Sequence, residues 1–155
     1  MALVYFGLGS NLGDRRKNLD DAIDLISLEI GDVLVRSGYY AGRPWGFDSK
    51  NDFLNAAILV GTQLSPLETL DASQRIERKM GRKEKTVSSY ADRIIDIDIL
   101  LYDMQIIKNE RLIAPHPLMH LRDFVLIPMA EIAPDLIHPV LNRSIVELKT
   151  GLSGG

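Results

Sequence analysis

A chain of 155 residues with a formal net charge of −3 is long enough to bury a sizeable core, and we expect one domain spanning residues 1–155. Its apolar runs fall well short of the roughly 20 residues that cross a bilayer, no signal peptide precedes the first predicted strand, and the mild acidity argues against a general nucleic-acid binder. Without cysteine the chain has neither disulfides nor thiolate metal sites, which fits a cytoplasmic protein.

The first 40 residues predict a strand, a helix and a second strand. Residues 2–8 form an apolar run that ends in a glycine-rich turn, Gly7 to Asp14. The third glycine of this turn stands one place too late for the dinucleotide fingerprint, and a tight turn explains the spacing at least as well as ligand contact. Apolar residues at helical spacing from Leu19 to Ile30 predict a helix with Gly31 as its C-cap, and residues 33–40 read as a strand.

A long connection and a third strand follow. Residues 41–52 form a loop of a length that is often functional, and it carries the only tryptophan, Trp45. That ring could stack on a flat heterocycle or simply pin the loop. Residues 53–62 predict an apolar strand interrupted by Asn55, whose amide needs partners if it is buried; ligand recognition and a backbone-satisfying role are both open.

A second helix begins at Ser65 with a capping box and a proline at its first position, and it ends at Gly81. Gln74 and Glu77 share one face near its end. Basic residues crowd into the last turns and the loop beyond: Arg75, Arg78, Lys79, Arg82, Lys83 and Lys85. They suggest a polyanionic ligand, or equally a solvated helix end.

The next strand carries two carboxylates. Its alternation predicts one face made of Ile95, Ile97, Ile99 and Leu101, and the other of Asp96, Asp98, Leu100 and Tyr102. Residues two apart on a strand lie about 6.6 Å apart and point the same way, so Asp96 and Asp98 stand side by side. Hard oxygen ligands so placed suit Mg²⁺; the alternative is the solvated outer face of a half-exposed strand.

The C-terminal part predicts one more helix, over residues 124–132, that closes the core, followed by a frayed tail from Gly151 to Gly155. His116 and His120 are four apart, but Pro117 between them argues against a helical zinc pair. The order of elements is β-α-β-β-α-β, so we predict an α+β fold with a ferredoxin-like antiparallel sheet and an additional C-terminal helix.

From about Tyr5 to Pro139 the chain resembles the 6-hydroxymethyl-7,8-dihydropterin pyrophosphokinases. Six segments stand in the order and at the spacing seen in that family: Gly9-Ser10-Asn11-Leu12-Gly13, Phe53-Leu54-Asn55-Ala56-Ala57, Gln74-x-Ile76-Glu77, Gly81-Arg82, Arg93-x-x-Asp96-x-Asp98-Ile99-Leu100 and Pro115-His116. No single segment is decisive, but six in register are.

The resemblance implies a folate-pathway enzyme that transfers the β,γ-pyrophosphoryl group of ATP to the hydroxymethyl group of a reduced pterin and releases AMP. It implies that Asp96 and Asp98 bind two Mg²⁺ ions and that Arg82 and Arg93 close over the triphosphate as catalytic groups. The ATP-binding residues by the same similarity are Gln74, Glu77, Arg111, His116 and Arg122. The pterin-binding residues are Asn55, Phe53, Phe124, Trp45 and Pro44. The expected partners are small molecules only, bound by a monomer or a homodimer.

Three departures from the family pattern accompany the resemblance. In the loop of residues 41–52, Arg43-Pro44-Trp45-Gly46 replaces a more proline-rich version. Asp92 places a carboxylate beside Arg93, and Pro117 follows His116 where an aromatic residue is often found. Two other classes of protein fit an Asp-x-Asp strand on this fold: a Mg²⁺-dependent nucleotidyl transferase or cyclase, which would release pyrophosphate, and a small-molecule-binding module without chemistry.

Overall fold

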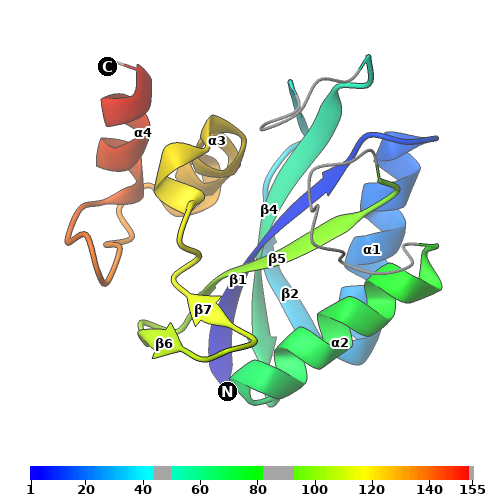
Figure 1. The fold of residues 1–155 in the computed structure, drawn as a ribbon, viewed down its shortest axis with the longest axis horizontal. Coiled ribbons are helices and arrows are strands. Elements are labelled where there is room, and N and C mark those ends of the chain that lie inside the picture. The colour runs from blue at the N-terminus through cyan, green and yellow to red at the C-terminus, as the bar shows by residue number, and fades with distance from the viewer. Residues whose placement is uncertain (44–49, 82–92, 154–155) are drawn as a thin grey trace.

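A computed structural model of the chain describes residues 1–43, 50–81 and 93–153 (Figure 1). Several residues discussed above lie outside these ranges: Pro44, Trp45, Gly46, Arg82, Lys83, Lys85, Asp92 and Gly155. Within the described residues, no helix has both the length and the hydropathy needed to span a membrane.

The centre of the fold is a five-stranded antiparallel sheet. Its strands are β1 (Ala2–Ser10), β2 (Gly31–Arg36), β3 (Tyr40–Gly42), β4 (Phe53–Thr62) and β5 (Asp96–Tyr102). The main order is β2-β4-β1-β5, and the short β3 pairs with β4 beside β2. With α1 (Arg15–Glu29) after β1 and α2 (Pro66–Lys79) before β5, this is the predicted ferredoxin-like β-α-β-β-α-β arrangement, which is confirmed.

Helices cover both faces of the sheet (Figure 1). Helices α1 and α2 lie on one face, and α3 (Asp123–Ile132) and α4 (Ile145–Ser153) on the other. A separate hairpin of β6 (Ile107–Lys108) and β7 (Ile113–Ala114) and a short 3₁₀ helix (Met119–Leu121) connect β5 to α3.

Two hydrophobic cores result from this layering. The first core joins the sheet to α1 and α2 and contains alternate residues of β1, among them Val4, Phe6 and Leu8. The second core joins the opposite face of the sheet to α3 and α4, with Ala57 and Met129 fully buried in it. Each strand therefore sends successive side chains to different cores.

The N-cap of α2 is as predicted, but the C-cap of α1 is not. Ser65 and Glu68 form the reciprocal capping box of α2. Helix α1, however, is capped by Ile30, and Gly31 is already the first residue of β2. A Cβ atom on Gly31 would lie 2.0 Å from the carbonyl oxygen of Gly61, so this glycine allows two strands to approach closely rather than ending a helix.

Two other predictions of elements are wrong in detail. The strand expected over residues 33–40 is two strands, because β2 ends at Arg36 and β3 begins at Tyr40. The tail expected to fray at Gly151 is helical up to Ser153, as the end of α4. That helix forms because its buried residues Ile145 and Leu148 pack into the second core.

A bulge interrupts the alternation of β5. Tyr5 pairs with Leu101 and Phe6 pairs with Ile99, which leaves Leu100 as the extra residue. Leu101 therefore points into the second core and not, as predicted, to the side of Ile99. Tyr102 turns toward the first core, where its hydroxyl donates a hydrogen bond to the Leu64 carbonyl at 2.7 Å and burial raises its pKa.

Candidate active site

The two carboxylates of β5 lie on the face of the sheet that α3 covers. Ile97 and Ile99 point into the first core, so Asp96 and Asp98, which we call the acidic pair, point to the opposite face. In register, Asp96 lies across from Gly9 of β1, and Gly9 lies across from Asn55 of β4. Asn55 and the acidic pair thus share a face, two strands apart.

Gly9 leaves the space between them without a side chain. A Cβ atom on Gly9 would lie 3.1 Å from Asn55 Oδ1 and 3.3 Å from Phe53 Cδ1. Gly9 belongs to β1 and Gly13 is the residue with positive φ (70°), so the glycine-rich segment combines a close approach at Gly9 with a turn at Gly13.

An aromatic and amide cluster borders this space. Asn55, which is 4% exposed, donates from Nδ2 to the Tyr40 carbonyl at 3.5 Å, and a Cβ on Gly42 would lie 3.3 Å from Asn55 Nδ2 and 3.8 Å from Phe124 Cβ. Phe53 and Phe124, predicted from the family resemblance to sandwich a ring, therefore flank the buried amide. We call Phe53, Asn55 and Phe124 the Asn55 cluster. Gly42 was not singled out by sequence, since its role depends on the pairing of β3 with β4.

Arg93 connects the Asn55 cluster to the acidic pair. Its Nη1 lies 3.6 Å from Asp96 Oδ2, and its guanidinium carbon lies 5.6 Å from the centroid of the Phe53 ring. Both side chains of the ion pair are largely buried, with 11% and 22% exposure, so the guanidinium holds a positive charge where solvent screens it little.

Asn11 fixes the backbone of Arg93. The Arg93 amide donates to Asn11 Oδ1 at 2.7 Å, the Asn11 amide donates to the Arg93 carbonyl at 3.1 Å, and Asn11 Nδ2 donates to the Asn51 carbonyl at 3.2 Å. Asn11 stands in one of the segments that carry the family resemblance, but its partners lie 40 and 82 residues away. The residues next to Asn11 in the sequence therefore do not predict that its side chain holds the Arg93 backbone.

Helix α2 supplies the flank of the acidic pair. Glu77 is 2% exposed, and its Oε2 accepts a hydrogen bond of 2.8 Å from the amide of Ile97, the residue between the two aspartates. Arg111 forms an exposed ion pair with Asp71, one helical turn before Gln74. The spacing of three places Gln74 between Asp71 and Glu77 along one side of α2, with Arg111 at the Asp71 end and the contact with β5 at the Glu77 end.

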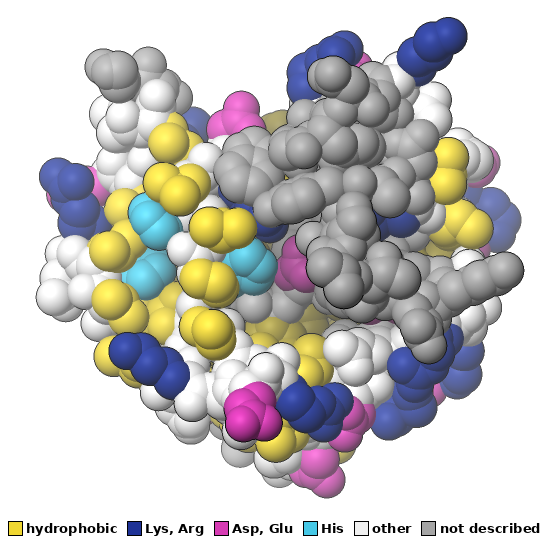
Figure 2. Space-filling view, viewed as in Figure 1, with side chains coloured by type: hydrophobic (Ala, Val, Ile, Leu, Met, Phe, Trp, Pro, Cys, Tyr) yellow, Lys and Arg dark blue, Asp and Glu magenta, His cyan; other side chains and the backbone are white. Residues whose placement is uncertain are grey.

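His116 and Arg122 lie between β5 and α3. The His116 amide donates to the Leu100 carbonyl at 2.8 Å, and its Nδ1 accepts from the Leu118 amide at 3.1 Å. The guanidinium of Arg122 lies 5.5 Å from the centroid of the Phe124 ring. Figure 2 shows the histidine side chains grouped with hydrophobic ones on one face of the molecule.

The acidic pair fits a hard divalent cation. Mg²⁺ is usually bound by one or two carboxylates and completes its shell with water and phosphate oxygens, and Asp96 and Asp98 supply such a donor set. Across the described ranges, no group of three or more histidine, cysteine, aspartate or glutamate side chains is placed to hold a metal ion. The pair accordingly suits a metal that is shared with a phosphate ligand.

Comparison with known proteins identifies the family of the chain. The family model of 7,8-dihydro-6-hydroxymethylpterin-pyrophosphokinase (HPPK) matches residues 5–134. A protein of Porphyromonas gingivalis named 2-amino-4-hydroxy-6-hydroxymethyldihydropteridine pyrophosphokinase is 44% identical over 141 residues, which cover 90% of this chain and 95% of that one. The protein of the same name from Aquifex aeolicus is 40% identical over 149 residues, covering 96% and 91% of the two chains.

Solved structures share the fold. One described as HPPK-DHPS in complex with substrates has a TM-score of 0.80 at 15% identity and covers 97% of this chain. The Plasmodium falciparum HPPK-DHPS with SDX-DHP has a TM-score of 0.76 at 18% identity. The present chain spans 43% of each of those longer chains. By the family match and the identity to its relatives, the chain belongs to the 7,8-dihydro-6-hydroxymethylpterin-pyrophosphokinase family.

Proposed function

We propose that the chain transfers the β,γ-pyrophosphoryl group of ATP to the hydroxymethyl group of 6-hydroxymethyl-7,8-dihydropterin. Family membership makes it an ATP-dependent pyrophosphokinase of folate biosynthesis and does not favour the nucleotidyl transferase or the binding module. The observation that carries the assignment to this face is that Asp96 and Asn55 pair with Gly9 from its two sides, with Asp98 on the same face. In the reaction the hydroxymethyl oxygen bonds to the β-phosphorus, the bond from that phosphorus to the α,β-bridging oxygen breaks, and AMP leaves.

We assign the two Mg²⁺ ions to Asp96 and Asp98. When bound, Mg²⁺ neutralises the charge of the triphosphate and of the departing AMP. The protein's own contribution is to hold the two carboxylates in register. The hydrogen bond from the Ile97 amide to Glu77 supports this, because it fixes the peptide that joins the two aspartates. Glu77 then acts on the nucleotide site through the backbone of β5.

We assign the pterin to the Asn55 cluster. An amide offers two donors and an acceptor, which match the polar edge of a pterin, and the two phenylalanines offer faces for its ring. The burial of Asn55 supports this role. A buried amide group left without hydrogen-bond partners is costly, so the site binds a ligand that completes those hydrogen bonds more tightly than one that does not. Pro44 and Trp45, in the connection between β3 and β4, complete the proposed pterin contacts.

We assign positive charge at the triphosphate to Arg93 and Arg82. A guanidinium has five N–H donors, so Arg93 can contact Asp96 and a phosphate oxygen together. Phosphoryl transfer depends mainly on positioning and on stabilising spreading charge, and both arginines serve that purpose. Gln74, Arg111, His116 and Arg122 are the proposed further contacts of the nucleotide. The proposed setting is the cytoplasm, with a monomer or homodimer that binds small molecules only.

The direct test is a product assay with purified protein, ATP, Mg²⁺ and 6-hydroxymethyl-7,8-dihydropterin. AMP that forms only in the presence of the pterin supports the proposal. Pyrophosphate released without pyrophosphorylated pterin would indicate a nucleotidyl transferase or cyclase. Absence of turnover by a protein that still binds both ligands would indicate a binding module.

A further inference from the structure

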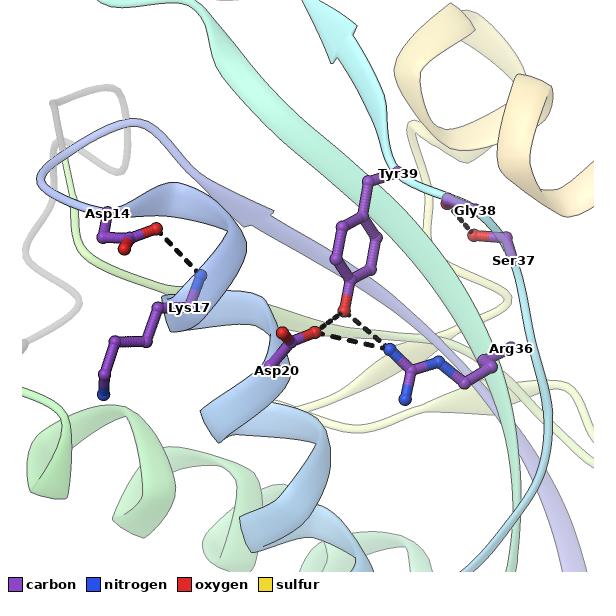
Figure 3. A network of polar contacts seen from close by, with 7 residues as sticks. All are labelled: Asp14, Lys17, Asp20, Arg36, Ser37, Gly38 and Tyr39. Carbon is purple, nitrogen blue, oxygen red and sulfur yellow. Dashed lines mark hydrogen bonds and ion pairs between the residues drawn. The ribbon is translucent and has the colours of Figure 1, made fainter.

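The segment between β2 and β3 is held from both layers of helices. Two consecutive tyrosines each donate a hydrogen bond to a carboxylate, but to opposite sides of the sheet: Tyr39 to Asp20 of α1, and Tyr40 to Glu131 of α3. Figure 3 shows the α1 side, where Arg36 Nη2 also lies 2.7 Å from the Tyr39 hydroxyl. The two contacts are alike in chemistry, so one serves as a control for the other.

The contact on the α3 side has three members. Glu131 Oε1 accepts from the Tyr40 hydroxyl at 2.5 Å and from the Gly38 amide at 2.9 Å. The Tyr40 hydroxyl and then the Gly38 amide lower the pKa of Glu131, so its carboxylate stays ionised and both hydrogen bonds are charge-assisted. One side chain of α3 thereby fixes both Tyr40, the first residue of β3, and Gly38, two residues earlier in the connection from β2.

This contact lies on the same face of α3 as the Asn55 cluster. Glu131 and Phe124 are seven positions apart, which is about two helical turns, or about 10.5 Å, on one face of a helix. At the Phe124 end, the close neighbour is Gly42, the last residue of β3. At the Glu131 end, the neighbours are Gly38 and Tyr40. Strand β3 thus lies along α3 and is attached at both ends.

Strand β3 also lies beside the buried amide, because β3 pairs with β4 and α3 packs over both strands. Asn55 Nδ2 donates to the carbonyl of Tyr40, and Gly42 lies against both Asn55 and Phe124. A change in the distance between β3 and α3 would therefore move Phe124 relative to Asn55. The hydroxyl of Tyr40 contacts Glu131 while its carbonyl contacts Asn55, so one residue joins the helix to the amide.

We propose that Glu131 is a positioning residue for the pterin: through Tyr40 and Gly38 it sets the separation between Phe124 and Asn55. This inference rests on the proposed pterin role of the Asn55 cluster. Glu131 acts through β3 and does not itself contact the pterin. Its loss therefore weakens pterin binding and leaves the acidic pair on β5 and its support from α2 unaffected.

The experiment compares the two tyrosine–carboxylate contacts. Tyr40→Phe, which removes one charge-assisted hydrogen bond, should raise the KM for the pterin about three- to tenfold with the KM for ATP unchanged. Glu131→Ala removes that hydrogen bond and the one from the Gly38 amide, so it should raise the pterin KM at least as much. Glu131→Gln keeps an acceptor oxygen and should stay within about twofold of the wild type. Asp20→Ala and Tyr39→Phe, on the α1 side, should leave both KM values unchanged whatever they do to the Tm.

Several results would overturn the inference. It is wrong if the α1-side variants raise the pterin KM as much as the α3-side variants, or if the KM for ATP rises in parallel. Should Glu131→Ala fail to fold, Tyr40→Phe compared with Tyr39→Phe makes the same test. Asn55→Ala separates the positioning role of Glu131 from the pterin role of the Asn55 cluster. If Asn55→Ala weakens pterin binding while Glu131→Ala and Tyr40→Phe do not, only the positioning role fails. If Asn55→Ala has no effect, the pterin assignment fails and the positioning role with it.

Discussion

Replacing Gly9 by alanine tests the space between the acidic pair and Asn55. The new Cβ would lie 3.1 Å from Asn55 Oδ1 and 3.3 Å from Phe53 Cδ1, so both side chains must move by a few tenths of an ångström. Alanine in a strand gains about 0.5–1 kcal/mol over glycine, and a displaced side chain costs about the same, so stability should change by less than about 1 kcal/mol. The displaced amide should lose about one hydrogen bond's worth of pterin affinity, roughly three- to tenfold in Kd.

The assay is pterin binding by calorimetry alongside thermal unfolding, with Gly7→Ala as the matched control. The three atoms nearest to a Cβ on Gly7 would be Leu100 side-chain atoms at 3.4–3.6 Å, an ordinary contact. Gly7→Ala should therefore bind the pterin as the wild type does. Equal pterin affinity in Gly9→Ala and wild type would refute the reasoning, and so would equal losses in the two glycine variants.

Three further predictions concern the metal site, the strand contact and acid stability. Asp98→Asn should lower turnover by about 100-fold or more with an unchanged Tm, because it removes one charge of the acidic pair; near-normal turnover in Mg²⁺ would contradict the metal assignment. Gly31→Ala should lower the free energy of unfolding, measured by chemical denaturation, by about 3 kcal/mol or more, because its Cβ would meet the Gly61 backbone. Gly61→Ala should lower it less, because the atoms nearest to its Cβ would belong to the flexible side chain of Met1. Burial and then the charge of His120 lower the pKa of His138, so the unfolded chain binds this proton more readily than the folded chain. The free energy of unfolding should therefore fall below about pH 6.5, by at most about 1.4 kcal/mol per pH unit. His138→Asn should flatten the decline in Tm between about pH 7.5 and 5.5, and an unchanged slope would contradict this.

Local patterns were sufficient to predict the main elements of the fold. The period of two in β5 and the capping box at Ser65 depend only on neighbouring residues, and both are present in the structure. The order of elements then limited the topology to the ferredoxin-like sheet, because short connections and right-handed crossovers leave few alternatives. What local patterns could not supply were contacts between distant segments, such as Asn11 with Arg93 or Tyr40 with Glu131.

Helix α4 shows a local signal that was present but missed. Ser144 and Glu147 form a reciprocal capping box, with hydrogen bonds of 3.1 and 3.2 Å, so the sequence Ser-Ile-Val-Glu does mark a helix start. Gly151 favoured a frayed tail because glycine disfavours a helix interior. Burial of Ile145 and Leu148 in the second core outweighs that local preference, and this core is visible only once the tertiary structure is known.

The bulge at Leu100 determines which side chains share a face with the acidic pair. Strict alternation would place Leu101 with Ile99 in the first core and Tyr102 on the opposite face, whereas the extra residue exchanges the two. Because the bulge comes after the acidic pair, alternation stays intact from Asp96 to Ile99, and both carboxylates remain on the face of Asn55. An extra residue between the two aspartates would turn one of them into the first core, where an ionised carboxylate without partners is strongly unfavourable. The position of the bulge thus lets one strand contribute to two cores and still present two carboxylates together.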